Sequence, residues 1–229
     1  MTLTVFNATA RAAQNTQALK KVWENLTEDS CPLIYNFHLH TIYSDGQLQP
    51  EDLIRQAVSI GLKGLAITDH HSVGGFLAAQ SWLEATNIEQ TPHLWTGVEI
   101  TSDLQNDEVH ILGYGFEPEH PALKPYLGGT RPKGSLGFAG NVIAALHQAG
   151  GLAVLAHPAR YQKPAHELIP AAAALGIDGA EAYYAYGGNP KPWKPTPHHK
   201  QQVKQLCAEY GLFTTCGTDT HGLNLLYRI

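Results

Sequence analysis

The chain has 229 residues, of which 43% are hydrophobic and 15% charged, and its formal net charge at pH 7 is −5. This length suits one well-buried domain, and no linker rich in Pro, Gly or Ser divides it. The negative charge argues against a duplex-DNA-binding surface, because such a surface needs clustered Lys and Arg.

The chain begins with a segment of helical periodicity, Ala10 to Leu26, which carries Leu19, Val22, Trp23 and Leu26 on one face. We interpret it as an extra N-terminal helix that packs on the domain, so that residues 1–30 form an extension and residues 31–229 the main domain. Seven apolar runs of strand length follow, and they are Leu33–Phe37, Gly64–Thr68, Leu94–Ile100, Val109–Tyr114, Leu152–Ala156, Asp178–Ala182 and Leu212–Gly217.

Helical segments alternate with these strands. The first runs from Pro50, with acidic residues in its first turn, to a stop at Gly61. The others are predicted at Val73–Ala85, Gly137–Gln148, Pro164–Leu175 and Pro197–Tyr210. This alternation is typical of an α/β protein.

Three clusters of metal-ligating residue types follow predicted strands. His38 and His40 lie two apart after the first strand, so both rings face the same side, and the turn that ends at Asp45 returns a carboxylate to them. Asp69-His70-His71 follows the second strand and Asp219-Thr-His221 the last. Because ligands gather where parallel strands end, these side chains predict a metal site.

Further candidates stand at strand ends. Glu99 ends an apolar run, and taken alone it would be a solvated edge residue. His110 faces the site only if its strand runs back antiparallel from a turn at residues 105–108. His157 follows the fifth strand and precedes Pro158, which fixes the loop. Of the two adjacent histidines, we expect His70 to face the site and His71 to point outward or to support a ligand.

The motifs HLHTxxSDG, TDH, GVEI, VHILGY, AHP and GTDTH occur in this order between residues 38 and 221. In this ordered set the chain resembles the PHP superfamily, named for polymerase and histidinol phosphatase. The resemblance implies a distorted (β/α)7 barrel with a trinuclear metal site. The implied ligands are His38, His40, Glu99 and Asp219 for one ion, Asp45, His70 and His221 for a second, and His110 and His157 with Glu99 for the third.

Within that superfamily the chain looks most like the small stand-alone phosphoesterases that act on nucleotides or oligonucleotide ends. The expected activity is phosphoester hydrolysis by a metal-bound hydroxide, with Asp45, Glu99 and Asp219 holding the metals and Arg160 clamping the phosphate. His and carboxylate ligands accept Zn, Mn and Fe alike, so the three divalent ions stay unassigned. Asp69 is expected to orient a ligand histidine.

Two other functions remain open on the residues alone. One is a metal-dependent amidohydrolase, and the other is a non-catalytic metal-containing module that binds a nucleotide. The oligomeric state is open as well. The sequence has three cysteines, Cys31, Cys207 and Cys216, with no CxxC spacing, and this predicts neither a disulfide framework nor a thiolate zinc site. A reducing compartment, no secretory leader and no membrane-spanning stretch together predict a cytoplasmic protein.

Overall fold

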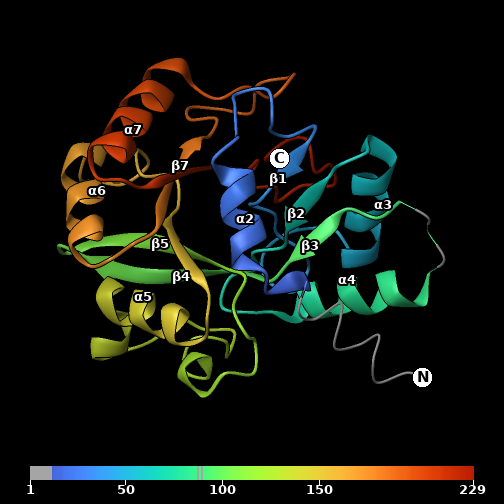
Figure 1. Ribbon diagram of the computed structural model, residues 1–229, viewed down its shortest axis with the longest axis horizontal. Helices are drawn as coiled ribbons and strands as arrows, with labels where there is room; N and C mark the ends of the chain where they lie inside the picture. Colours follow the sequence, from blue (N-terminus) through green and yellow to red (C-terminus); the bar gives the residue numbers. More distant parts are fainter. Residues whose placement is uncertain (1–11, 87, 89) are drawn as a thin grey trace.

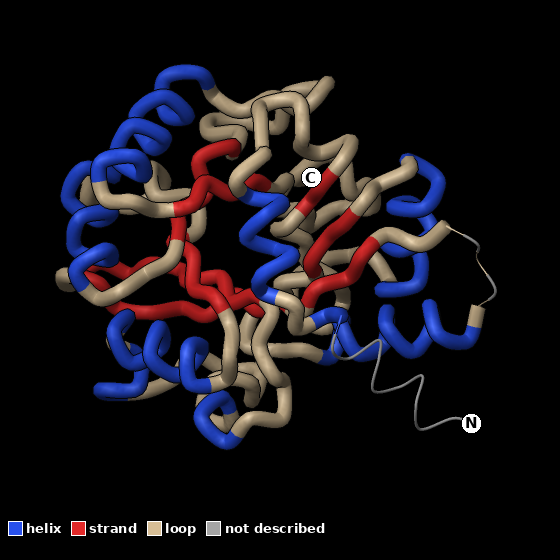
Figure 2. The backbone as a smooth tube through the Cα atoms, viewed as in Figure 1, coloured by secondary structure: helices blue, strands red, loops and turns tan. Residues whose placement is uncertain are grey.

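The computed structural model describes residues 12–86, 88 and 90–229. It has two sheets with helices on their outer sides (Figure 1, Figure 2). Helices α3 (Pro50–Ile60) and α4 (Gly74–Ala85) accompany the smaller sheet, and α5 (Ala139–Gln148), α6 (Ala165–Ala174) and α7 (Pro197–Glu209) accompany the larger one. Two short 3-10 helices, Pro121–Leu123 and Gly134–Gly137, lie before α5. The mixed α/β class that the sequence predicted is therefore confirmed.

The smaller sheet consists of three parallel strands in the order β1 (Tyr35–Asn36), β2 (Gly64–Ala66) and β3 (His93–Trp95). The larger sheet has the order β4 (Gly97–Leu104), β5 (Asp107–Tyr114), β6 (Leu152–Leu155), β7 (Gly179–Tyr183) and β8 (Phe213–Cys216). Its first two pairings are antiparallel and its last two parallel. The site depends on this arrangement, because β5 runs back beside β4.

The predicted strand Leu94–Ile100 is two strands, β3 and β4, in different sheets. The chain leaves the first sheet at Thr96, whose hydroxyl donates to the carbonyl oxygen of Phe116 over 2.9 Å. The part of the chain that the structure describes forms no closed barrel of continuous strand pairing. Single bridges join the two sheets instead, between Leu39 and Thr220 and between His70 and Glu99.

The helix ends follow the sequence signals. Helix α3 begins at Pro50 with Glu51 and Asp52 in its first turn, where acidic side chains suit the positive helix end. It ends at Gly61, which adopts the left-handed conformation at φ 82°. The apolar face of α3 is buried, with Leu53 and Ile54 fully inaccessible.

The N-terminal helix α2 (Thr16–Trp23) is shorter than predicted, and the expected start at Ala10 lies outside the described residues. Its Trp23 ring lies 5.4 Å from the ring of Tyr114 and 5.9 Å from that of Phe213, measured between centroids. Because Leu19 and Trp23 belong to the main core, α2 is part of the packed domain. No helix in the described ranges is long and apolar enough to cross a membrane.

The expectation that the cysteines form no disulfide was wrong. Cys31, just before β1, forms a disulfide with Cys216, the last residue of β8, and Cys207 is free and buried. The partners are separated by 185 residues, so their pairing could not be read from spacing. Since disulfides persist mainly in oxidising environments, this bond removes the support that the cysteine count gave to a reducing compartment.

Candidate metal centre

The predicted ligands meet at one place, where the two sheets come together. His38 and His40 follow β1, and Asp219 and His221 follow β8. Backbone hydrogen bonds join these two segments, with Asp219 N–H donating to the His38 carbonyl over 2.9 Å and His40 N–H to that of Thr220 over 3.0 Å. Four predicted ligands from the two ends of the chain are thereby brought into register.

The antiparallel hairpin of β4 and β5 supplies two further predicted ligands, Glu99 on β4 and His110 on β5. Its turn contains Gln105 and Asn106, both in the left-handed conformation, so the conditional prediction of an antiparallel return is confirmed. His110 on β5 donates from Nδ1 to Glu99 Oε1 over 2.8 Å. His157, after β6, has its Nε2 3.3 Å from the same oxygen.

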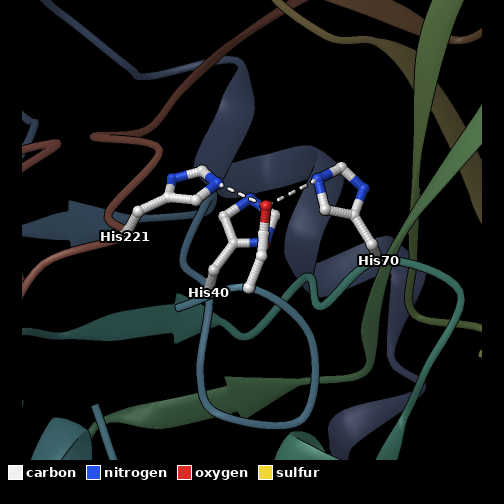
Figure 3. Close-up of side chains that lie close together, drawn as sticks. His40, His70 and His221 are labelled. Carbon is white, nitrogen blue, oxygen red and sulfur yellow. Dashed lines mark hydrogen bonds and ion pairs between the residues drawn. The ribbon is translucent and has the colours of Figure 1, made fainter. Parts of the chain in front are cut away.

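Three groups of candidate metal ligands result, and within each group the ligand atoms lie within 4.8 Å of one another. They are His38, His40, Glu99 and Asp219; His40, Asp45, His70 and His221; and His70, Glu99 and His110. Figure 3 shows the rings of His40, His70 and His221 turned toward one another. These groups contain eight of the nine residues that the family resemblance implied, and the ninth, His157, lies outside them but contacts Glu99.

The innermost group is almost completely buried. The side chains of His38 and His40 are inaccessible, and those of Glu99 and Asp219 are 1% and 2% exposed. His40 Nε2 lies 3.0 Å from Glu99 Oε2 and 3.2 Å from Asp219 Oδ1, yet makes no hydrogen bond. A buried imidazole nitrogen aimed between two carboxylates fits a divalent cation in this group.

The second group is open to solvent on one side. Asp45 is 54% exposed and its Oδ2 lies 3.2 Å from His221 Nε2. His221 donates from Nδ1 to the Asp219 carbonyl over 2.8 Å, which leaves the Nε2 lone pair free for a ligand bond. A substrate could approach this side of the centre.

The pKa values reflect these contacts. Burial alone would raise the pKa of Glu99, but His38 and His110 outweigh it and hold that pKa well below its usual range. Burial lowers the pKa of His40, whereas the carboxylates of Asp219 and Glu99 outweigh it and raise the pKa to about 9. For His70 burial prevails, and its pKa falls to about 4.

Asp69 does not orient a histidine as expected. Its Oδ1 accepts from Thr41 N–H over 2.7 Å and from the Ser44 hydroxyl over 2.8 Å, and its Oδ2 accepts from the Thr41 hydroxyl over 2.7 Å. It thus fixes the turn that carries Asp45. His71 points to Thr101, with 3.2 Å between Nε2 and Oγ1, while His70 faces the cluster.

Three residues at the site were missed by sequence reasoning. Glu181, in the middle of β7, is fully buried, and its Oε1 lies 3.1 Å from His38 Nδ1. Tyr184 donates to Asp219 Oδ2 over 2.6 Å, and Arg228 Nε donates to the same oxygen over 2.9 Å. A glutamate between alanines in an apolar strand was a usable signal, because buried carboxylates need partners. Tyr184 and Arg228 carried no comparable signal in the sequence.

Arg160 lies where a substrate oxygen could reach it. Its Nη1 donates to Asp219 Oδ2 and to the Tyr184 hydroxyl, each over 3.0 Å, and its side chain is 40% exposed. Close packing of backbones also shapes the centre. A Cβ atom on Gly217 would lie 2.2 Å from the Cβ of His38.

A mixed α/β fold with a cluster of histidines and carboxylates at converging strand ends defines a candidate metalloprotein. Residues 36–128 match the family model described as the PHP domain, so this part of the chain is similar to that superfamily. A Bifidobacterium adolescentis protein described as a putative metal-dependent phosphoesterase has a similar fold, with a TM-score of 0.67 over 83% of this chain and 88% of that one at 22% identity.

Curated relatives are similar to all or part of the described chain. The 5'-3' exoribonuclease Rnm of Salmonella typhimurium is 36% identical over 102 residues, which are 44% of this chain and 34% of that protein. The 3',5'-nucleoside bisphosphate phosphatase of Chromobacterium violaceum is 36% identical over 50% of this chain and 39% of its own length. The 5'-3' exoribonuclease of Haemophilus influenzae is 25% identical over 82% of this chain and 89% of that protein. The chain thus spans about a third of the first of these relatives and most of the last.

Proposed function

We propose that this protein is a metal-dependent phosphoesterase that hydrolyses phosphate esters of nucleotides or of oligonucleotide ends. The observation that carries the proposal is the convergence of six histidines and three carboxylates, from segments throughout the chain, on shared positions. The PHP domain match and the names of the relatives, which are a phosphatase and exoribonucleases, support it.

The nine residues are proposed to hold three divalent ions, Zn, Mn or Fe. His38, His40, Glu99 and Asp219 would hold the first, Asp45, His70 and His221 the second, and His110, His157 and Glu99 the third. When bound, such ions supply Lewis acidity toward phosphoryl oxygens and activate water at neutral pH.

The side chains of this chain have separate tasks in the proposal. Asp45, Glu99 and Asp219 supply three negative charges, fewer than three divalent cations need, so the loaded site attracts a phosphate dianion. Arg160 donates N–H groups to the phosphate oxygens and neutralises charge that develops in the transition state. Asp45 is placed at the open side of the cluster, where the ester would enter.

The finer expectations about the molecule stay proposals. A distorted (β/α)7 barrel is supported by the single bridges between the two sheets. The division into an extension of residues 1–30 and a domain of residues 31–229, a cytoplasmic location and the lack of a duplex-DNA-binding surface are inferred from sequence alone.

A substrate panel tests the function. We expect the purified protein to release phosphate or nucleotide from nucleoside phosphates or short RNA, and chelation to abolish this release. Asp45→Asn should cost more than the roughly 10- to 100-fold that loss of a partner supporting a ligand costs. Asp52→Asn, an exposed aspartate on α3, is the matched control and should retain full activity.

Hydrolysis of amide substrates without phosphate release would favour the amidohydrolase alternative. If the metal-loaded protein binds nucleotides but turns over no substrate of either kind, it is a binding module. Phosphate release that persists after complete metal removal would contradict the proposed mechanism.

A further inference from the structure

Strands β5 and β6 bring two of the predicted ligands, His110 and His157, to the same oxygen of Glu99. His110 Nδ1 lies 2.8 Å and His157 Nε2 3.3 Å from Glu99 Oε1. The two imidazole rings are 5.5 Å apart between centroids. The strands pair in an antiparallel register that places His110 opposite Ala156, the residue before His157. The geometry of this last rung therefore sets the separation of the two histidines.

A regular ladder could not bring both imidazoles to this oxygen. Residues directly opposite each other in an antiparallel pair share one face of the sheet, and the next residue along a strand takes the other face. In a continuous β6, His157 would therefore face away from His110. Instead β6 ends at Leu155, and the backbone at His157 adopts the left-handed conformation with φ 28°. The rung between His110 and Ala156 is thus the point where the two strands must separate.

The Tyr161 hydroxyl occupies that rung. A hydrogen-bonded pair in an antiparallel ladder exchanges two N–H···O bonds. One of them forms directly, from the Ala156 N–H to the His110 carbonyl over 3.0 Å. In place of the other, the His110 N–H donates to the Tyr161 hydroxyl over 2.8 Å, and this hydroxyl donates to the Ala156 carbonyl over 3.0 Å. Two hydrogen bonds and an oxygen atom thus span a gap that one hydrogen bond normally closes.

The turn after β6 brings the ring of Tyr161 back to the two strands. The Arg160 N–H donates to the His157 carbonyl over 3.0 Å and closes this turn. The partly buried Tyr161 ring packs against the main core and lies 5.4 Å from the ring of His157 and 6.4 Å from that of His110. Burial raises the pKa of the Tyr161 hydroxyl well above its usual value, so this group keeps its proton and remains a donor.

We propose that Tyr161 is a positioning residue for the third ion, because its hydroxyl holds β5 and β6 apart at the separation that lets His110 and His157 bind one ion together with Glu99. The inference rests on the proposed function, since it requires an ion at these three ligands. It adds a residue that acts through the backbone groups of His110 and Ala156 and is not itself a ligand.

Tyr161→Phe tests this role, because it removes the hydroxyl and keeps the ring and its packing, so the variant should fold. The His110 N–H and the Ala156 carbonyl then either close to a direct bond or lose the oxygen that fixes their distance. In both cases the separation of the two histidines is no longer held. We expect the affinity for the third ion to fall by about 10- to 100-fold, as is typical when a group that supports a ligand is lost. The other two ions should bind as in the wild type.

The measurement is a titration of Co²⁺ into protein from which a chelator has removed the metals, with the number of bound ions and their visible absorption recorded. Because this absorption depends on the arrangement of ligands around each ion, a general loss of stability alone does not change it. His110→Ala lacks one ligand of the third ion and provides the reference for its loss. Adding Tyr161→Phe to His110→Ala should remove no further ion, because the two changes act on the same site.

Tyr183→Phe is the matched control. It also removes a buried tyrosine hydroxyl, which donates to the Leu26 carbonyl over 3.2 Å and not to a strand that carries His110 or His157. Both tyrosine variants should lower the unfolding temperature, because each leaves a backbone group without its partner. Only Tyr161→Phe should change the Co²⁺ titration.

An affinity for the third ion in Tyr161→Phe equal to that of the wild type would overturn the inference. An equal loss at every ion, or the same loss in Tyr183→Phe, would also overturn it, because the hydroxyl would then only stabilise the fold. So would a wild type that binds only two ions. None of these outcomes depends on turnover. A wild type that binds three ions and hydrolyses no phosphate ester would refute the proposed function alone.

Discussion

Glu181 is the buried charge that connects the strand core to the candidate metal ligands. Its two oxygens lie 3.1 and 3.2 Å from His38 Nδ1, and Oε2 also accepts from the His157 backbone N–H over 3.0 Å. A carboxylate on one ring nitrogen fixes the tautomer and orientation of the imidazole and leaves Nε2 free to bind an ion. Glu181 therefore positions His38 and the loop that carries His157.

Glu181→Gln should weaken divalent metal binding by about 10- to 100-fold, because an amide replaces the charged acceptor of His38. Metal affinity is measured by titrating divalent metal into protein from which a chelator has removed the metals. The unfolding temperature of the same samples is also recorded. Glu119→Gln, an exposed position, serves as the control. Unchanged affinity in Glu181→Gln would show that this carboxylate only stabilises the fold.

The sequence predicted the residues whose chemical type and strand-end position agree. His38, His40, His70 and His221 lie within four residues of the end of an apolar run, so their meeting could be expected from strand geometry and the family resemblance. Glu181 lies inside a strand, and Asp69 could support either a histidine or a turn. Which contact forms depends on the three-dimensional spacing of β1, β2 and β7, and a single sequence does not contain that spacing.

At the level of elements, helix positions were predicted well and strand partners were not. Helices α3 and α7 begin at Pro50 and Pro197, because proline at the first helical position is a local signal. At the split between β3 and β4, by contrast, Thr96 donates a hydrogen bond to Phe116, twenty residues away, and such a distant contact gives no local signal. The Cys31–Cys216 bond similarly depends on the approach of β1 to β8.

This disulfide ties the segment before β1 to the end of β8, and it should contribute about 2 to 5 kcal/mol to stability by restricting the unfolded chain. We expect dithiothreitol to lower the unfolding temperature of the wild type. It should have no effect on the double variant Cys31→Ala/Cys216→Ala, which starts from the lower value.

Thiol titration of the unfolded, unreduced protein provides the direct control. It should detect one thiol, Cys207, per chain. Three titratable thiols would show that the bond does not form in solution.

At the scale of the whole molecule, the candidate centre concentrates buried charge where the two sheets meet, so the stability of the metal-free protein should depend on pH. The folded pKa of His40 is raised to about 9 from an ordinary value of 6.5. Between pH 6.5 and about 9, the folded protein therefore keeps a proton on His40 that the unfolded protein has lost. The stability from His40 is fully present below pH 6.5 and is lost as the pH rises through 9. For His70, whose pKa falls to about 4, stability is lost as the pH falls from 6.5 toward 4.

The chelated protein should accordingly unfold at its highest temperature near pH 6.5. Metal affinity should rise with pH up to about 9, because a cation must displace the proton on His40. Thermal unfolding from pH 4 to 10, with and without metal, measures both effects. A flat profile for the chelated protein between pH 6.5 and 9 would contradict the assigned role of His40.

The α/β class could be predicted from alternating apolar and helical segments, whereas the separation into two sheets could not. The alternation of strand and helix segments along the sequence indicates that strands and helices pack in layers. It does not specify that β5 reverses direction, and this reversal takes the chain out of simple parallel order.

Gly217 limits which substitutions this protein can tolerate. The Cβ of any other residue there would lie 2.2 Å from that of His38 and 2.7 Å from its backbone nitrogen, so the two chain segments would be forced apart. Even alanine would thus displace an imidazole without removing any functional group. A saturation mutagenesis screen would therefore rank this chemically inert position beside the histidines, and its intolerance would reflect backbone spacing alone.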